Sequence, residues 1–137
     1  MRVVWKHLPL TSIHPFAMGA ALASEAARNQ GKFWEFHDKL FKNQPKIQRP
    51  FLLQYAQELG LDMKRFEHSL EIEQAKPLID ADEAEAKALG VTGTPAFFVN
   101  GHFLSGAKPF EEFAQSINAE LTKLNVPVPP AAAKAGG

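Results

Sequence analysis

A proline at the entrance to a short strand is the feature of this sequence with the most chemical content. Thr94-Pro95 precedes the apolar run Ala96–Val99, which predicts a strand, and Asn100-Gly101 then gives a strong signal for a two-residue hairpin turn. Because proline has no N–H to donate to a sheet, it is confined to the first position or to an edge of a strand. A cis bond at Thr94-Pro95 would be a selected feature, since cis bonds are rare even before proline. The alternative, on pattern alone, is an ordinary turn that starts a strand.

The residue types of common catalytic sites do not converge elsewhere. The chain has no cysteine, so these residues supply no thiolate, no disulfide and no cysteine metal site. The five histidines never occur at a zinc-binding spacing with a third ligand nearby. No serine has a nucleophile-elbow context, and no glycine cluster joins a strand to a helix as a phosphate loop requires. The sequence therefore indicates no catalytic residue, no metal and no cofactor.

The composition is that of an ordinary globular domain. Of the 137 residues, 45% are hydrophobic and 22% are charged, which is enough to bury a core. Lys and Arg (15) balance Asp and Glu (15), and the aromatic residues are not interleaved with a basic patch. Neither nucleic acid nor a membrane is therefore indicated as a partner. Met1–Trp5 lacks the apolar stretch and the cleavage site of a signal peptide.

One strand and several helices are expected to position the hairpin. The β-branched and aromatic residues of Arg2–Lys6 predict a buried strand. Apolar spacing predicts helices over residues 16–29, 32–43, 52–59, 72–89 and 109–124, and a further one capped by Asp62. Pro77 should kink or split the helix at 72–89. No internal repeat is found.

Two side-chain clusters on these helices have competing interpretations. An aromatic stripe on the helix at 32–43 is interpreted as core rather than as a ligand pocket, and it comprises Phe33, Phe36, His37, Leu40 and Phe41. Four acids on the helix at 72–89 lie around much of its circumference, which indicates a solvated face rather than a cation site. They are Asp80, Asp82, Glu83 and Glu85.

These stretches together resemble a known family. Residues 93–101, GTPAFFVNG, followed by a strand and Gly106-Ala107, resemble the cis-proline loop and closing hairpin of DsbA-like thioredoxin-fold proteins, which are thiol-disulfide oxidoreductases. Val3–Leu10 resembles the strand after the family's redox helix, and residues 14–41 resemble the opening of its helical insertion. The resemblance implies an α/β, thioredoxin-like (DsbA-like) fold over residues 1–124, with a helical insertion at about 15–89. Residues 125–137 are expected to form a flexible Pro/Ala-rich tail.

The departure from the family is as informative as the match. Family members carry a first strand and a Cys-x-x-Cys motif before the position where this sequence begins, so the fold is expected to lack its first strand and redox helix. Most members are exported proteins, which suggests a periplasmic or exported location. Without cysteine, this chain alone is expected to be redox-inactive.

The resemblance also implies a binding site and partners. In the family, the loop before the proline lies beside the reactive cysteine, and its backbone pairs with an extended substrate segment by β-augmentation. Carried over, Gly93, Thr94 and Pro95 are the substrate-binding residues, and an extended protein or peptide is the partner. The missing strand would lie between Val3-Val4 and Pro95–Val99, leaving two unpaired edges. We therefore expect strand pairing or strand exchange between copies to give a homo-oligomer, or a shift of the first strand into the vacant position.

Three function hypotheses follow. The first is the domain of a thiol-disulfide oxidoreductase that is inactive as this cysteine-free chain. The second is a non-catalytic thioredoxin-fold module that binds peptides or associates with itself. The third is a relative with serine in place of the first cysteine, such as kappa-class glutathione transferases or chromene-carboxylate isomerases. These usually carry a Trp-Gly-x-Asp-Arg-like sequence after the hairpin, where this chain has residues 105–109, SGAKP, which counts against the third hypothesis.

Overall fold

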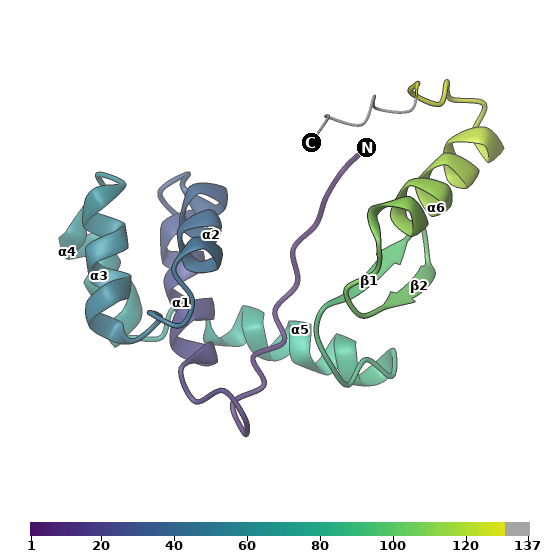
Figure 1. The fold of residues 1–137 in the computed structure, drawn as a ribbon. Coiled ribbons are helices and arrows are strands. Elements are labelled where there is room, and N and C mark those ends of the chain that lie inside the picture. Colours follow the sequence, from purple (N-terminus) through teal and green to yellow (C-terminus); the bar gives the residue numbers. More distant parts are fainter. Residues whose placement is uncertain (131–137) are drawn as a thin grey trace. The chain divides into compact units, whose positions relative to one another are not determined.

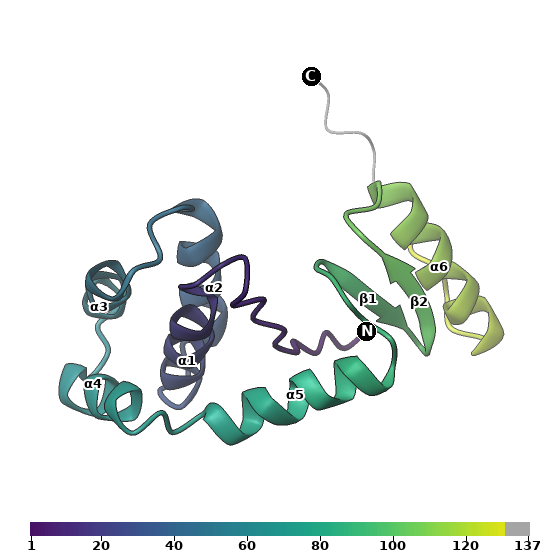
Figure 2. The same cartoon turned by 90° about the horizontal axis from the view of Figure 1, so that it is seen from below.

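The computed structural model describes residues 1–130. Its contacts divide the chain into two compact units, Met1–Thr92 and Gly93–Gly137. Five helices belong to the first unit, and a hairpin with one helix belongs to the second (Figures 1 and 2). The part of the expected tail at 131–137 lies outside the described residues.

The first unit is helical, as the apolar periodicity predicts. Its helices are α1 (Ala17–Arg28), α2 (Phe33–Lys42), α3 (Arg49–Glu58), α4 (Met63–Glu71) and α5 (Lys76–Ala88). Glycines end the predicted helices where expected, with a positive φ of 74° at Gly31 and 70° at Gly60. The predicted cap of α4 is confirmed, because the Asp62 side chain accepts a hydrogen bond from the Arg65 N–H at 3.0 Å.

Small side chains allow the helices of the first unit to approach closely. Ala23 and Ala27 of α1 and Ala56 of α3 are fully buried. The remaining volume is filled by Phe36, Phe66 and Ile79, which are the largest fully buried side chains, and the rings of Phe36 and Phe66 lie 5.8 Å apart. The aromatic stripe of α2 is therefore core for the buried Phe33 and Phe36, whereas Phe41 at its far end is 57% exposed.

Proline starts α5 rather than kinking it. The helix predicted over 72–89 begins at Lys76, and Pro77 lies in its first turn, where an N–H has no helical partner in any case. The residues before it form a turn in which Glu73 has a φ of 46°. The expected split is thus found, with the break just before the proline.

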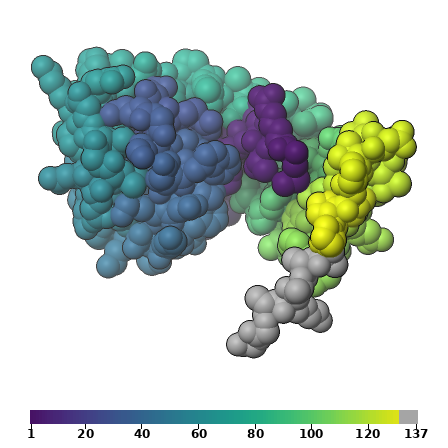
Figure 3. Space-filling model, turned by 90° about the horizontal axis from the view of Figure 1, so that it is seen from above, coloured from purple at the N-terminus to yellow at the C-terminus, as the bar shows by residue number. Residues whose placement is uncertain are grey.

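The predicted strand at Arg2–Lys6 is wrong. Residues 1–10 form neither helix nor strand, and Val3 and Val4 are 64% and 60% exposed. The segment lies at the molecular surface (Figure 3). A strand exists only through pairing with another, and no residue in the described part of the chain pairs with this one. The β-branched composition indicates suitability for a sheet, which is not sufficient to form one.

The second unit is a two-stranded hairpin with a helix against it. β1 (Ala96–Val99) pairs antiparallel with β2 (His102–Ser105), in a register that joins Ala96 to Ser105 and Val99 to His102. The predicted type I′ turn is confirmed, since Asn100 and Gly101 have φ of 46° and 86°. The helix α6 (Phe110–Lys123) follows Pro109, which occupies the cap position rather than the first helical position.

We predict that the core of the first unit depends on Phe36. Phe36→Ala should lower the free energy of unfolding by about 3–5 kcal/mol, because it removes a fully buried ring and leaves a cavity. Urea unfolding followed by helical circular dichroism measures this loss. The matched control on the same helix is Phe41→Ala, which should cost less than about 1 kcal/mol. Equal losses from the two substitutions would contradict the placement of the core.

Candidate functional site

The residues carried over from the resemblance lie together at the start of β1. Gly93, Thr94 and Pro95 are all exposed and lead directly into the strand. The Thr94–Pro95 peptide bond is cis. The carbonyl oxygen of Pro95 accepts a hydrogen bond from the Gly106 N–H at 2.9 Å, so the proline stands in register opposite β2.

The hairpin register decides which backbone groups of β1 point away from β2. In an antiparallel pair, directly opposed residues alternate between those that exchange hydrogen bonds and those that do not. Pro95 bonds with Gly106, so residues 95, 97 and 99 direct their backbone groups toward β2. Ala96 and Phe98 direct theirs to the opposite side. Thr94, which precedes the strand, makes no backbone hydrogen bond with a described residue. We call the free backbone groups of these three residues the open edge. No other described residue pairs with this edge.

This parity also explains why proline is tolerated at position 95. Its backbone nitrogen faces β2 rather than the open edge, at the end of the hairpin where the strand pairing stops. The missing N–H of proline therefore removes no donor from the open edge. The outward positions are held by residues that do have an N–H. Ala96 and Phe98 therefore keep their donors and acceptors on the open edge.

Aromatic side chains line one face of the hairpin beside the open edge. Phe98 and Phe103 are directly opposed in the register, their ring centroids lie 5.0 Å apart, and they are 44% and 50% exposed. On the other face, Phe97 packs on Phe113 of α6 with ring centroids 4.7 Å apart. The hairpin thus presents a backbone edge next to an apolar surface, which suits an extended apolar segment.

The open edge carries no group for acid–base or nucleophilic chemistry. Residues 91–101 include no charged residue, no histidine and no cysteine. His102 on β2, which follows this stretch, pairs with Glu120 on α6 at 3.2 Å. Among residues 1–130, no three His, Asp or Glu side chains come together as a metal-binding cluster.

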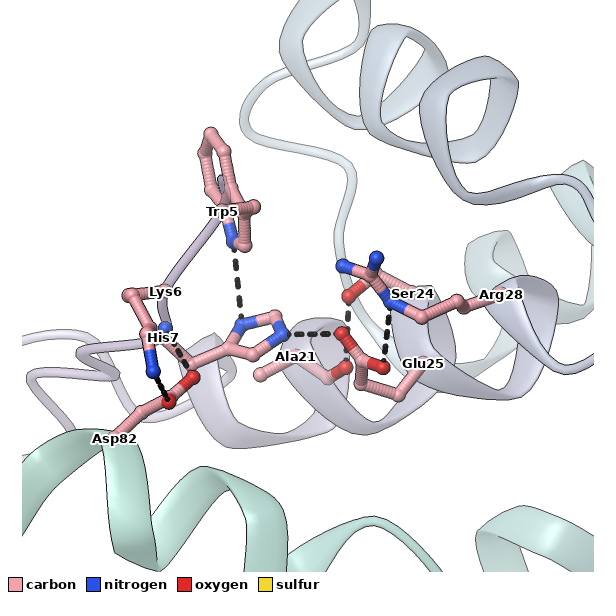
Figure 4. A network of polar contacts seen from close by, with 8 residues as sticks. All are labelled: Trp5, Lys6, His7, Ala21, Ser24, Glu25, Arg28 and Asp82. Atoms are coloured by element: carbon pink, nitrogen blue, oxygen red, sulfur yellow. Dashed lines mark hydrogen bonds and ion pairs between the residues drawn. The ribbon is translucent and has the colours of Figure 1, made fainter. Parts of the chain in front are cut away.

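A buried polar network in the first unit is the feature that sequence reasoning missed (Figure 4). His7 lies at its centre and is 6% exposed. Its backbone N–H donates to Asp82 of α5 at 2.9 Å, and its Nε2 lies 2.8 Å from Glu25 of α1. Arg28 donates from Nε to the second oxygen of Glu25, also at 2.8 Å. The network therefore binds the N-terminal segment to two helices that are far apart in sequence.

The donor chemistry of tryptophan assigns the proton on His7. The Trp5 indole N–H can only donate, and it lies 3.4 Å from His7 Nδ1, so Nδ1 is the acceptor. In the neutral form of the ring the proton is then on Nε2, from which it is donated to Glu25. Burial by itself raises the pKa of Glu25, but the hydrogen bonds from His7 and Arg28 outweigh it, and the pKa of this carboxyl is lowered overall.

Asp82 corrects the expected solvated face of α5. Its side chain is buried, 7% exposed, and it accepts from the His7 backbone and pairs with Lys6 at 3.1 Å. Lys6 also pairs with Glu85 at 2.8 Å, and the pKa of Lys6 is raised by Glu85 and Asp82. The periodicity of one helix could not reveal a partner 75 positions away. Glu25, by contrast, falls on the alanine stripe of α1, and an acid at a buried helical position was a detectable signal.

Comparison with known proteins gives a family match over most of the chain. The model of the DSBA-like thioredoxin domain matches residues 14–118. The structure is similar to that of a thioredoxin-like oxidoreductase from Silicibacter pomeroyi DSS-3, with a TM-score of 0.71 and 29% identity over 78% of this chain and 62% of that one. None of the helices in residues 1–130 has the length and apolar character needed to cross a membrane.

Among curated proteins, the chain is similar to part of larger antiporters. It is 43% identical over 117 residues to the Na⁺/H⁺ antiporter NhaA 3 of Salinispora tropica, which covers 85% of this chain and 18% of the antiporter. It is 44% identical over 107 residues to the NhaA antiporter of Herminiimonas arsenicoxydans, covering 78% and 17%. The chain thus spans less than a fifth of the length of these relatives.

We predict that Glu25 makes the first unit sensitive to acid. Because its pKa in the folded protein lies below the ordinary value of 4.5, its stabilising effect is complete above that value and is lost as the pH falls through the folded pKa. Glu25→Gln should therefore lower stability at neutral pH, and the difference from the original chain should shrink below about pH 4.5. Urea unfolding at a series of pH values measures this.

The matched control is Glu71→Gln, at an exposed position on α4 that makes no ion pair with any residue of the described range. The stability difference for this control should be small and nearly independent of pH. A loss at Glu25→Gln that stays constant from neutral to acid pH would contradict the assignment.

Proposed function

This chain belongs to the DSBA-like thioredoxin domain family, and from that membership we propose that it is the client-binding part of a thiol-disulfide oxidoreductase. Its fold class is the thioredoxin-like, DsbA-like fold that the resemblance implied. In this proposal Gly93, Thr94 and Pro95 receive an extended segment of a client protein. Disulfide exchange on that client is the reaction of the complete site.

The open edge is the observation that carries the proposal. Thr94 makes no backbone hydrogen bond with a described residue, and Ala96 and Phe98 direct their backbone groups away from β2. An extended client pairs with the backbone of Thr94, beside Pro95, through its own backbone and so needs no particular sequence. The exposed rings of Phe98 and Phe103 favour clients with apolar side chains, as unfolded segments have.

The chemical step needs a thiolate that these 137 residues do not contain. A thiolate supplied beside the loop attacks one sulfur of a client disulfide, forms a mixed disulfide with it and releases the other sulfur as a thiolate. A second thiolate then attacks the mixed disulfide and regenerates the first. The role of this chain is to position the client so that its disulfide lies next to the thiolate. The chain alone is redox-inactive.

A non-catalytic module that binds peptides or associates with itself is the second candidate. The absence of cysteine favours it, because binding through the open edge uses backbone groups only and is complete without sulfur. The antiporter relatives, in which the matched segment is less than a fifth of the protein, are compatible with such a module as one part of a larger chain.

We predict that client binding depends on the backbone of Thr94 and not on its side chain. Thr94→Pro removes the N–H that the open edge offers, and it should weaken binding of an unfolded, fluorescently labelled peptide by about 5–10-fold. Thr94→Ala keeps the N–H and is the matched control, which should stay within about twofold of the original chain. Fluorescence anisotropy measures both affinities.

The amide NMR signals of the hairpin residues show whether each Thr94 variant has kept its fold. With β1 and β2 intact, equal affinities for Thr94→Pro and Thr94→Ala would overturn the docking assignment. Failure of the original chain, kept monomeric, to bind any unfolded peptide would overturn the proposed function as a whole.

We predict that the chain accelerates no disulfide reduction by itself. In an insulin precipitation assay with dithiothreitol, the rate should equal the rate with dithiothreitol alone, because no cysteine is present to form the mixed disulfide. A rate above that background would contradict the assignment of the thiolate to a source outside these residues. We therefore expect the chain to bind an unfolded peptide but not to accelerate the reduction of insulin.

A further inference from the structure

The ring of His7 makes two hydrogen bonds that only one protonation state satisfies (Figure 4). Nε2 lies 2.8 Å from Glu25 of α1, whose carboxylate accepts, and Nδ1 lies 3.4 Å from the Trp5 indole N–H, which can only donate. The neutral ring fits both partners, with its proton on Nε2. A protonated ring has an N–H on each nitrogen, so it still fits Glu25 but presents a donor to a donor at Trp5.

The bond between His7 and Glu25 is held in place from the side of α1. Arg28 donates from Nε to the other carboxylate oxygen at 2.8 Å, and its guanidinium lies over the ring of Phe33, 3.8 Å from the ring centroid. Glu25 itself is 4% exposed. A positive charge on His7 strengthens the bond to Glu25, because hydrogen bonds between charged groups are stronger than neutral ones. This side of the ring therefore stays bonded when a proton is added.

The bond between His7 and Trp5 is the one that gives way. It is the longer of the two, and Trp5 is half-buried, so a rotation of the side chain can turn the indole N–H to water. The other neighbours of the indole are aromatic rings of α2, among them His37 with ring centroids 4.7 Å apart in an edge-on arrangement. Contacts between ring faces and edges place no requirement on the indole N–H.

The charges around His7 are already paired with one another. Lys6 pairs with Asp82 at 3.1 Å and with Glu85 at 2.8 Å, as Arg28 does with Glu25. By element, the titratable groups that face the network are Glu25 and Arg28 of α1, His37 and Asp38 of α2, Asp82 and Glu85 of α5, and Lys6 of the N-terminal segment. A proton added to His7 therefore leaves these pairs intact and removes one contact, the bond from Trp5.

We propose that His7 and Trp5 form a pH-sensitive switch, in which protonation of His7 releases the Trp5 indole N–H while the ring stays bonded to Glu25. The released indole reorients against the aromatic side chains of α2, and the helices of the first unit keep their packing. The inference concerns the first unit only and does not rest on the proposed function.

Nuclear magnetic resonance of the full chain tests the switch without any substitution. Histidine is the side chain whose charge ordinarily changes between about pH 5 and about pH 8, so the titration covers this range. The ring nitrogen signals of His7 report its protonation, and the indole N–H proton signal of Trp5 reports its hydrogen bond. We expect the Trp5 signal to shift upfield as its bond is lost, with the same midpoint as the His7 ring. The backbone amide signals of the buried Ala23 and Ala27 should stay in place.

Three variants identify the group that responds. Trp34→Phe removes the other of the two tryptophans and so assigns the Trp5 signal. His7→Gln offers Glu25 an N–H and Trp5 a carbonyl oxygen but takes up no proton, so the Trp5 signal should no longer shift with pH. The matched control is His37→Gln, which removes the other titratable ring in contact with Trp5 and should leave the midpoint unchanged.

Each contrary result would overturn the inference. A Trp5 signal that stays in place while the His7 ring takes up its proton shows that the bond is not coupled to protonation. A shift that persists in His7→Gln, or that disappears in His37→Gln, assigns the response to another group. A His7 ring that stays neutral until the Ala23 and Ala27 signals report unfolding shows that the folded unit has no such switch. The titration of the unsubstituted chain decides the question even where a variant does not fold.

Discussion

Every structural feature of this chain with functional meaning depends on one constraint: the N–H and C=O groups of an extended backbone must find partners. Two of the described segments, Arg2–Lys6 and Ala96–Val99, have the same strand-forming composition, and of these two Ala96–Val99 forms a strand whereas Arg2–Lys6 does not. The difference is local. Asn100 and Gly101 turn the chain back so that β1 meets β2 within two residues, at little cost in loop closure. No described residue offers Arg2–Lys6 such a partner.

Side chains take the place of a sheet at the N-terminal segment. Asp82 accepts the His7 backbone N–H that a neighbouring strand would otherwise bind, and the His7 ring is held between Trp5 and Glu25. Each buried charge has an opposite or hydrogen-bonding partner, which is the condition under which such groups are tolerated in a core. The network thus positions Lys6 and His7 on α1 and α5 while the preceding valines stay exposed.

Helix positions, caps and the hairpin turn could be predicted because they depend on neighbours within four residues. The glycines at the helix ends, the Asp62 cap and the Asn100-Gly101 turn are of this kind. The features that could not be predicted depend on partners far away in sequence. The pattern of α5 indicates a solvated Asp82 because the helix itself carries no sign of His7. The composition of Arg2–Lys6 predicts a strand because composition does not reveal whether a partner strand exists. The candidate site falls between these cases. Thr94 and Pro95 stand out in the local pattern, and the family resemblance implies a binding role for them together with Gly93. The parity that makes Ala96 and Phe98 part of the edge required the observed bond between Gly106 and Pro95.

In the proposed function, docking and chemistry are physically separable, so a chain without cysteine can carry the docking half. The open edge would recognise backbone groups of the client, and these have no redox state to maintain. A thiolate, by contrast, depends on its local electrostatic environment, and residues 91–101 provide no charge to create one.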